Sequence, residues 1–177
     1  MSEKYKTYPG GLFFVTLTIV GWIDVFTRRE YADEIIKNLN YCIQNKGLKV
    51  FAFCIMPSHI HMVASAGDEG LLSNILRDFK SYTAKRIIGL IQENSQESRK
   101  ERLLHLFRYY GKFNKHNAEF QFWQQHNHPI DLLTANFIMQ KIDYIHNNPV
   151  KAGLVTEAHC YVFSSANRDT DLKLEEY

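Results

Sequence analysis

The sequence contains few cysteines and no long apolar run. The three cysteines, at positions 42, 54 and 160, are odd in number and form no Cys-x-x-Cys pair. They therefore indicate neither a disulfide framework nor a zinc knuckle. The longest apolar run, Leu12 to Ile23, is interrupted by two threonines and a glycine. At that length it is too short to cross a bilayer as a helix.

The N-terminus also lacks a targeting signal. Residues 1–6 read Met-Ser-Glu-Lys-Tyr-Lys, which is polar where a signal peptide is apolar. We therefore expect a cytoplasmic protein that does not associate with membranes. A chain of 177 residues, 45% hydrophobic and 23% charged, predicts one globular domain with a sizeable core. We find no internal repeat and no linker in it.

Charge is present but unevenly spread. The net charge is only +2, yet residues 77–116 hold ten Lys or Arg against four acids, which makes this segment +6 and the remainder −4. Six aromatic residues are interleaved with these cations, at positions 79, 82, 107, 109, 110 and 113. Clustered cations with stacking rings suit a nucleic-acid strand. A solvated helix followed by a charged loop has the same composition and is the alternative.

The spacing of apolar residues predicts four strands and three helices. We expect strands over residues 11–20, 48–56, 59–66 and 120–130, with a hairpin turn at Pro57 and Ser58. Helices are expected over residues 28–45, 71–92 and 134–148. The last should begin at a Thr134 cap and end before Pro149, because proline disfavours a helical conformation in its predecessor. Residues 94–117 carry no clear pattern, and the tail from residue 156 is either a short strand or an extended arm.

The order of these elements, β-α-β-β-α-β-α, predicts an α+β fold. The first six match a ferredoxin-like (split βαβ) antiparallel sheet with its helices on one face, and the C-terminal helix is an addition to it. RNA-binding modules and many enzymes share this arrangement, so the fold alone does not decide the function.

The most informative local motif is His59-Ile60-His61, in the second strand of the expected hairpin. Alternate residues of a strand point to the same side, so the two imidazoles should lie about 7 Å apart at Cα, close enough to share one divalent metal. Ile60, Met62 and Ala64 should then face the core. Hydrogen-bonded surface histidines produce the same pattern and are the alternative.

A tyrosine in the last helix lies off the expected buried stripe. At about 100° per residue, one apolar stripe contains Ala135, Ile138, Met139, Ile142 and Ile145. Tyr144 lies roughly 200° from Ile142, nearly opposite, and shares that side with Asn148, one turn further on. His146 falls on the stripe, which predicts a packing role for it. An exposed or interface tyrosine is the alternative explanation.

Two motifs carry a family resemblance. The first is Met56-Pro-Ser-His-Ile-His-Met-Val63, and the second is Asp143-Tyr-Ile-His-Asn-Asn-Pro-Val-Lys-Ala-Gly-Leu-Val155. Together and in this order they resemble the REP-associated tyrosine transposases, which belong to the HUH (His, bulky apolar residue, His) single-strand nucleases. The resemblance extends from about residue 10 to residue 165. Residues 94–117 are longer than the corresponding part of smaller members.

The resemblance implies a transposase that cleaves and rejoins single-stranded DNA next to hairpin or REP-like repeats, through a 5′-phosphotyrosine intermediate. His59, His61 and Asn148 would bind a divalent metal, Mg²⁺ or Mn²⁺, and Tyr144 would be the nucleophile. The partner would be single-stranded DNA with a hairpin. The chain would act as a monomer or a homodimer.

The basic segment supplies three predicted contacts to the DNA backbone, Lys80, Lys85 and Arg86, which would make binding strongly salt-dependent. Two other functions fit part of the sequence. An RRM-like, non-catalytic nucleic-acid-binding module would need exposed aromatic residues on central strands, for which Phe51 and Phe53 qualify. A metal-dependent hydrolase would release a free 5′-phosphate instead of forming a covalent adduct.

Overall fold

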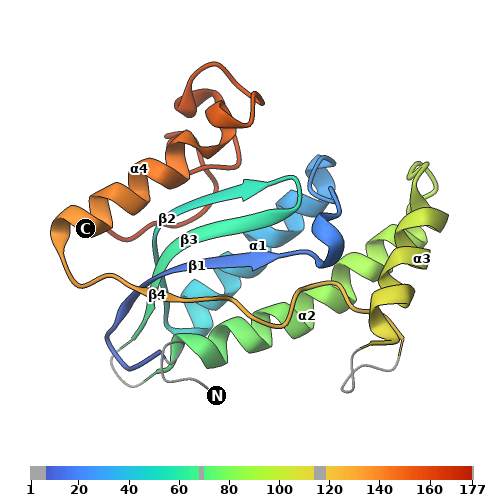
Figure 1. Ribbon diagram of the computed structural model, residues 1–177, viewed down its shortest axis with the longest axis horizontal. Coiled ribbons are helices and arrows are strands. Elements are labelled where there is room, and N and C mark those ends of the chain that lie inside the picture. The colour runs from blue at the N-terminus through green and yellow to red at the C-terminus, as the bar shows by residue number, and fades with distance from the viewer. Residues whose placement is uncertain (1–6, 68–69, 114–118, 177) are drawn as a thin grey trace.

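The computed structural model describes residues 7–67, 70–113 and 119–176. They form an antiparallel sheet with the strand order β2-β3-β1-β4 and helices packed against both faces (Figure 1). In chain order the elements are β1 (Leu12–Thr18), a 3-10 turn (Val20–Trp22), α1 (Arg29–Lys46), β2 (Leu48–Met56), β3 (His59–Ala66), α2 (Leu72–Glu93), α3 (Lys100–Gly111), β4 (Ile130–Asp131), α4 (Ala135–Lys151) and a second 3-10 turn (Ala158–Cys160).

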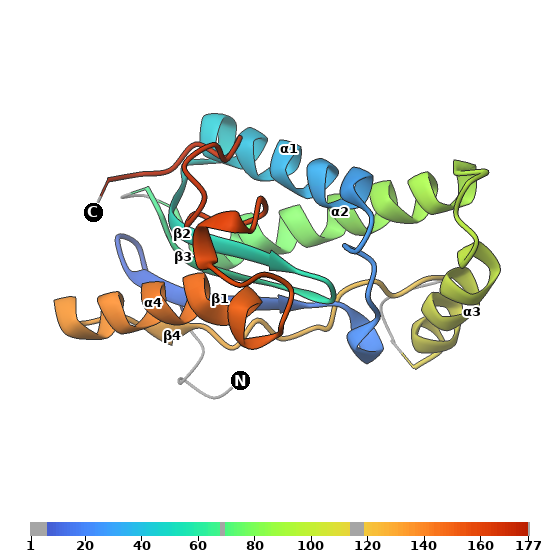
Figure 2. The same cartoon turned by 90° about the horizontal axis from the view of Figure 1, so that it is seen from above.

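The strand order is that of a ferredoxin-like sheet, which confirms the predicted α+β fold. Helices α1 and α2 lie side by side on one face, and α4 lies across the other face over β2 and β3 (Figures 1 and 2). The sheet is therefore the middle layer. Its α4 face is the one that carries the candidate site described below.

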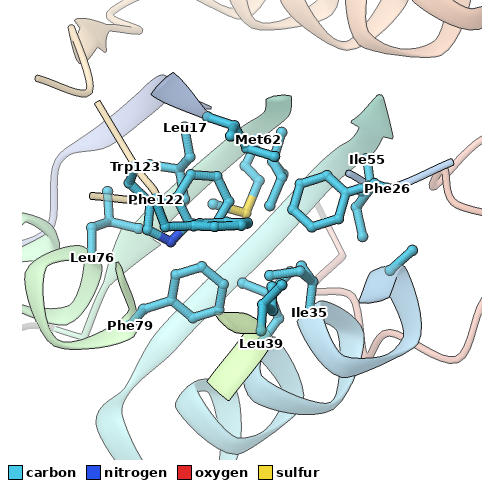
Figure 3. Packing of buried hydrophobic residues seen from close by; sticks show 14 of the residues in the cluster. Leu17, Phe26, Ile35, Leu39, Ile55, Met62, Leu76, Phe79, Phe122 and Trp123 are labelled. Atoms are coloured by element: carbon cyan, nitrogen blue, oxygen red, sulfur yellow. The ribbon is translucent and has the colours of Figure 1, made fainter. Parts of the chain in front are cut away.

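The main core lies between the sheet and the pair α1–α2. The alternation of β3 places Ile60, Met62 and Ala64 in this core, fully buried, as the sequence predicts. Figure 3 shows Met62 of the sheet, Ile35 of α1 and Phe79 of α2 on different sides of this one core. A smaller apolar cluster on the other face joins the sheet to α4, and its buried members are Phe14, Ala52, Cys54, Met56, Val63, Leu132 and Ile145.

The predicted helices and hairpin are largely confirmed. Helix α1 ends where Gly47 adopts a left-handed conformation with φ of 71°, which glycine takes without strain. Helix α2 begins and ends within one residue of the predicted range. Thr134 caps α4 by accepting a hydrogen bond from the Phe137 N–H through its side chain. No helix in the ranges 7–67, 70–113 and 119–176 is long and apolar enough to cross a membrane.

The predicted strand over residues 120–130 is wrong for most of its length. Only Ile130 and Asp131 form β4, while the preceding residues follow β1 through scattered backbone hydrogen bonds. Phe122 and Trp123 are adjacent and both buried in the main core. A regular strand would send them to opposite faces. Pro129 also lacks a backbone N–H for pairing.

Helix α4 ends later than predicted, whereas the tail after it agrees with one of the two predicted alternatives. Helix α4 continues to Lys151 and includes Pro149, whose missing N–H removes only one helical hydrogen bond, in the last turn. The tail after α4 is an extended arm along β2, where the Ile55 N–H donates to the Phe163 carbonyl. The segment without a clear pattern, residues 94–117, contains α3, which packs against α2.

The segment between α2 and α3 is held against the start of α1 by a buried carboxylate, that of Glu97. The side chain of Glu97 is fully buried and pairs with Arg28, 2.8 Å away, and with Arg99, 3.0 Å away. Arg99 also donates to the Asp24 carbonyl and to the Thr27 hydroxyl. Hydrogen bonds from Arg99, together with the charges of both arginines, lower the pKa of Glu97 to about 2.

Replacing Glu97 with glutamine should destabilise the fold by about 3 kcal/mol, because it leaves two partly buried arginines without their carboxylate. Urea unfolding monitored by circular dichroism measures the change. Exposed Glu101 in α3 is the matched control, and the stability of Glu101→Gln should stay within about 0.5 kcal/mol of the parent.

The stabilisation by Glu97 should also depend on pH. Because the pKa of Glu97 is lowered from 4.5, its contribution to the free energy of unfolding is present above about pH 4.5 and is lost as the pH falls toward 2. If Glu97→Gln and Glu101→Gln were equally stable, the proposed stabilisation of the fold by Glu97 would be wrong.

Candidate active site

The two histidines of the His-x-His motif project from β3 toward α4. His59 pairs with Thr18 of β1, and His61 pairs with Thr16. The imidazole centroids are 4.6 Å apart, so the predicted placement on one side of the strand is confirmed. The ring of His61 also stacks on Phe14, with the two centroids 5.3 Å apart.

Burial and hydrogen bonding keep both imidazoles neutral and oriented. Burial lowers the pKa of His61 to about 3, and it also lowers the pKa of His59. Both rings are therefore neutral at pH 7, the state in which an imidazole nitrogen has a lone pair for a metal. Nδ1 of His61 lies 2.9 Å from the Thr16 hydroxyl, and Nδ1 of His59 lies 3.2 Å from the Ser58 hydroxyl. Such bonds orient a ring so that its Nε2 can be the ligand.

Tyr144 of α4 lies against this histidine pair. Its ring centroid is 5.4 Å from that of His61 and 5.9 Å from that of Phe14, while 41% of the residue stays exposed. All these residues belong to one chain, so this arrangement needs no second copy. Tyr144 lies off the buried stripe of α4, as predicted, but it is not opposite that stripe. The stripe is rotated, because Met139 is exposed whereas Phe137 packs on the α4 cluster.

Asn148 follows Tyr144 by one helical turn and has an unusual environment. Its Nδ2 is the single buried side-chain nitrogen or oxygen, within the ranges described, that has no hydrogen-bond partner. Burying an unpaired polar atom costs about 1–3 kcal/mol, so such atoms are rare and often mark a ligand site. The two amide atoms of asparagine have nearly the same shape. The buried position therefore suits a ligating Oδ1 equally well.

The three side chains fit a divalent cation in number and type. In the described part of the chain, no group of three or more His, Cys, Asp or Glu residues could hold a metal. Any third side-chain ligand at His59 and His61 would therefore belong to another residue type, such as the amide of Asn148. Two imidazoles and one amide oxygen form a mixed set that accepts several divalent metals.

Two lysines that were not predicted from the sequence flank the ring of Tyr144. Nζ of Lys141 and Nζ of Lys151 each lie 5.8 Å from its ring centroid. Lys141 also lies over the ring of Phe14, at 4.8 Å. Their positions, three residues before and seven after Tyr144, put them on one helical face, which is the signal that would have identified them.

The three predicted DNA contacts are not part of this cluster. They lie on α2, on the other face of the sheet (Figure 1). Lys80 is half-buried and donates to the Gln124 carbonyl and to Asn127 Oδ1, and burial lowers its pKa to about 8. Arg86 pairs with Glu34, 3.4 Å away, and Lys85 is exposed.

His146 and the two phenylalanines of β2 do not contribute to a binding site in the structure. His146 is half-buried and its Nε2 is hydrogen-bonded to the Ser165 hydroxyl, 2.8 Å away, which agrees with a packing role. An RRM-like surface is not formed by the two phenylalanines of β2, because Phe53 is fully buried in the main core and Phe51 is half-buried in the α4 cluster.

Comparisons with known proteins show a family of transposases and a shared fold. The family model for IS200-like transposases matches residues 23–112, just over half of the chain. A curated Haemophilus influenzae protein, assigned as a REP-associated tyrosine transposase, is 25% identical over 98% of this chain and 90% of its own length.

Two solved structures are also similar. A REP-associated tyrosine transposase bound to a REP hairpin has a TM-score of 0.64 and 18% identity, over 96% of this chain and 85% of its own. A protein of Deinococcus radiodurans, assigned as a transposase, has a TM-score of 0.48 and 16% identity, over 82% of this chain and 96% of its own. The first shares the α+β fold described above. On the match to the family model, this chain belongs to the IS200-like transposase family.

Proposed function

We propose that this protein is a metal-dependent transposase that cleaves and rejoins single-stranded DNA next to hairpin or REP-like repeats. The observation that carries the proposal is the contact between the rings of Tyr144 and His61. A tyrosine beside two neutral imidazoles, with an unpaired amide one turn away, has the groups that phosphoryl transfer to a phenol requires.

The reaction is an exchange of phosphodiester bonds. The Tyr144 oxygen attacks the scissile phosphorus, a bond from that oxygen to phosphorus forms, and the bond from phosphorus to the 3′-oxygen breaks. The phenolic proton leaves the nucleophile, and the departing 3′-oxygen takes up a proton to become a hydroxyl. A second 3′-hydroxyl then attacks the 5′-phosphotyrosine and restores Tyr144. One phosphodiester replaces another, so no nucleotide cofactor is needed.

Each side chain of the site has a separate part in this exchange. His59, His61 and Asn148 would hold the divalent cation, Mg²⁺ or Mn²⁺, which supplies Lewis-acid stabilisation of charge on the phosphate. The ammonium groups of Lys141 and Lys151 lie beside the phenol ring, where they would neutralise negative charge that develops during the transfer.

The proposed substrate is a single strand that carries a hairpin. Support comes from the related solved structure, which is that of a transposase bound to a REP hairpin, and from the positive segment on α2 and α3. Of the three predicted backbone contacts, we retain Lys85 and Arg86, which are exposed although Arg86 also pairs with Glu34, and leave out Lys80, whose ammonium is hydrogen-bonded within the chain. We also propose that the protein acts as a monomer or homodimer in which each chain supplies a complete site.

Incubation of a labelled, hairpin-containing single strand with the protein and Mn²⁺ tests the proposed function. The transposase reaction gives a covalent protein–DNA adduct that survives denaturing gel electrophoresis. Cleavage without an adduct would instead indicate a hydrolase. Binding without cleavage would indicate a non-catalytic module.

The double variant Lys85→Ala, Arg86→Ala should bind single-stranded DNA more weakly at every sequence. Loss of two phosphate contacts should also reduce the slope of log affinity against log salt by about 1.4. Fluorescence anisotropy at several salt concentrations measures both quantities. The double variant Lys37→Ala, Lys49→Ala removes the same charge from exposed positions on α1 and β2 and should keep the slope. An unchanged slope in the first variant would remove Lys85 and Arg86 from the interface.

A further inference from the structure

A tryptophan stands beside the candidate active site and has no part in the reaction proposed above. Trp22 ends the 3-10 turn after β1, and 59% of the residue is exposed. Its ring lies against that of His59, with centroids 5.2 Å apart and planes at 73°. A large aromatic ring so open to water beside a polar site is available to stack on a ligand.

The backbone of this turn adopts an unfavourable conformation to place the ring there. Trp22 has φ of 55°, in the left-handed region that bulky residues rarely adopt. The preceding residue is Gly21, with φ of 61°. Strain of this kind costs about 1–3 kcal/mol and concentrates at functional sites. The position of the Trp22 ring is therefore maintained against the local backbone preference.

Helix α3 supports the turn and extends the aromatic surface. A side chain at Gly21 would collide with Tyr110, so glycine allows α3 to approach closely. Tyr110 contacts Tyr109, with ring centroids 5.5 Å apart, and Tyr109 contacts Phe113, with centroids 5.1 Å apart. Tyr109 and Phe113 are largely exposed, and Lys112 beside them is exposed as well.

We propose that Trp22, Tyr109 and Phe113 form a base-stacking track for the unpaired strand that flanks the scissile phosphate. The inference rests on the proposed function, because it takes His59 as the point where that phosphate lies. Flat, exposed rings bind any base through its π face, and a neighbouring cation contributes attraction to the DNA backbone. Trp22 is the ring nearest the site, so it would hold the base next to the phosphate that Tyr144 attacks.

The experiment compares a strand whose flank carries normal bases with one whose flank is abasic, in EDTA so that metal binding does not contribute. The parent should bind the base-containing flank about 5- to 150-fold more tightly, the range of one stacked base. Trp22→Gly should lose most of this difference, while Trp22→Tyr should keep most of it. Tyr41→Ala, which removes a similarly exposed ring from α1, is the control and should behave like the parent.

Two further measurements separate stacking from a purely structural role. Glycine tolerates the positive φ, so Trp22→Gly should be at least as stable as the parent. The other tryptophan, Trp123, is only 5% exposed. Quenching of tryptophan fluorescence by the base-containing strand should therefore disappear in Trp22→Tyr.

The outcomes distinguish this inference from the function on which it rests. If the parent forms the adduct with Mn²⁺ but Trp22→Gly keeps the full preference for bases, the stacking track is wrong and the transposase reaction stands. If Trp22→Gly binds Mn²⁺ more weakly yet keeps that preference, Trp22 only supports His59, and the track is again wrong. If the parent neither binds the strand nor forms the adduct, both proposals fail.

Discussion

Replacing Tyr144 with phenylalanine should abolish the covalent protein–DNA adduct and leave DNA binding intact. The substitution removes one oxygen, the proposed nucleophile, and keeps the ring that contacts His61 and Phe14. Loss of a nucleophile lowers the rate by at least about 10⁴-fold. Tyr144 is 41% exposed, so the free energy of unfolding should change by less than about 0.5 kcal/mol. Denaturing gels measure the adduct, and anisotropy measures binding.

Tyr161 provides the contrasting control for this substitution. It packs on the α4 cluster, its hydroxyl donates to the Ile55 carbonyl 2.8 Å away, and burial raises its pKa. Tyr161→Phe should therefore form the adduct normally but lose about 1 kcal/mol of stability, because a carbonyl loses its donor. If Tyr144→Phe still forms the adduct, the nucleophile is another residue. Peptide mapping of the adduct would then identify it.

Local patterns were sufficient to predict much of the fold. The alternation of β3 placed His59 and His61 on one side and Ile60 on the other, because side-chain direction in a strand depends only on sequence parity. Apolar spacing and the terminal glycine at Gly47 located α1 to within one residue at each end. These features are set by residues close together in the chain.

Features that depend on packing between distant segments were not predictable in the same way. The irregular course of residues 120–130 follows from Phe122 and Trp123 both filling the main core, which no local pattern shows. The hydrogen bonds of Lys80 depend on that same segment, 44 or more residues away. For this reason the sequence suggested Lys80 as a DNA contact, whereas in the structure its ammonium is hydrogen-bonded within the chain.

The candidate site was partly predictable for a related reason. The sequence identified Tyr144 and Asn148 as one face of α4, but the rotation of this helix on the sheet decides which face meets the histidines. That rotation is set by Phe137, Ile138 and Ile145 packing on the α4 cluster. A helical wheel treats all apolar residues alike, so it does not show which of them contact the sheet.

Removing either histidine should eliminate metal binding and, with it, strand cleavage. His59→Ala and His61→Ala should each weaken Mn²⁺ binding by more than about 100-fold, because loss of a direct ligand exceeds the 10- to 100-fold effect of losing a supporting residue. Calorimetric titration measures the affinity, and EDTA should stop adduct formation by the parent until Mn²⁺ is restored. His146→Ala is the control, since its ring is bonded to Ser165; it should bind Mn²⁺ normally. An adduct that forms undiminished in EDTA would refute the metal requirement while leaving Tyr144 as nucleophile.

Asn148 gives the sharper test of the same site, because its two expected effects have opposite signs. Nδ2 of Asn148 is buried without a partner, so Asn148→Leu should stabilise the metal-free protein by about 1 kcal/mol through removal of an unsatisfied polar atom. The same change should weaken Mn²⁺ binding by more than about 100-fold, because the amide is proposed as a direct ligand and not as a supporting residue. Urea unfolding in EDTA and titration with Mn²⁺ measure the two effects separately. A variant that loses stability and keeps its Mn²⁺ affinity would show that the amide is structural, and the metal would then have only two side-chain ligands from this chain.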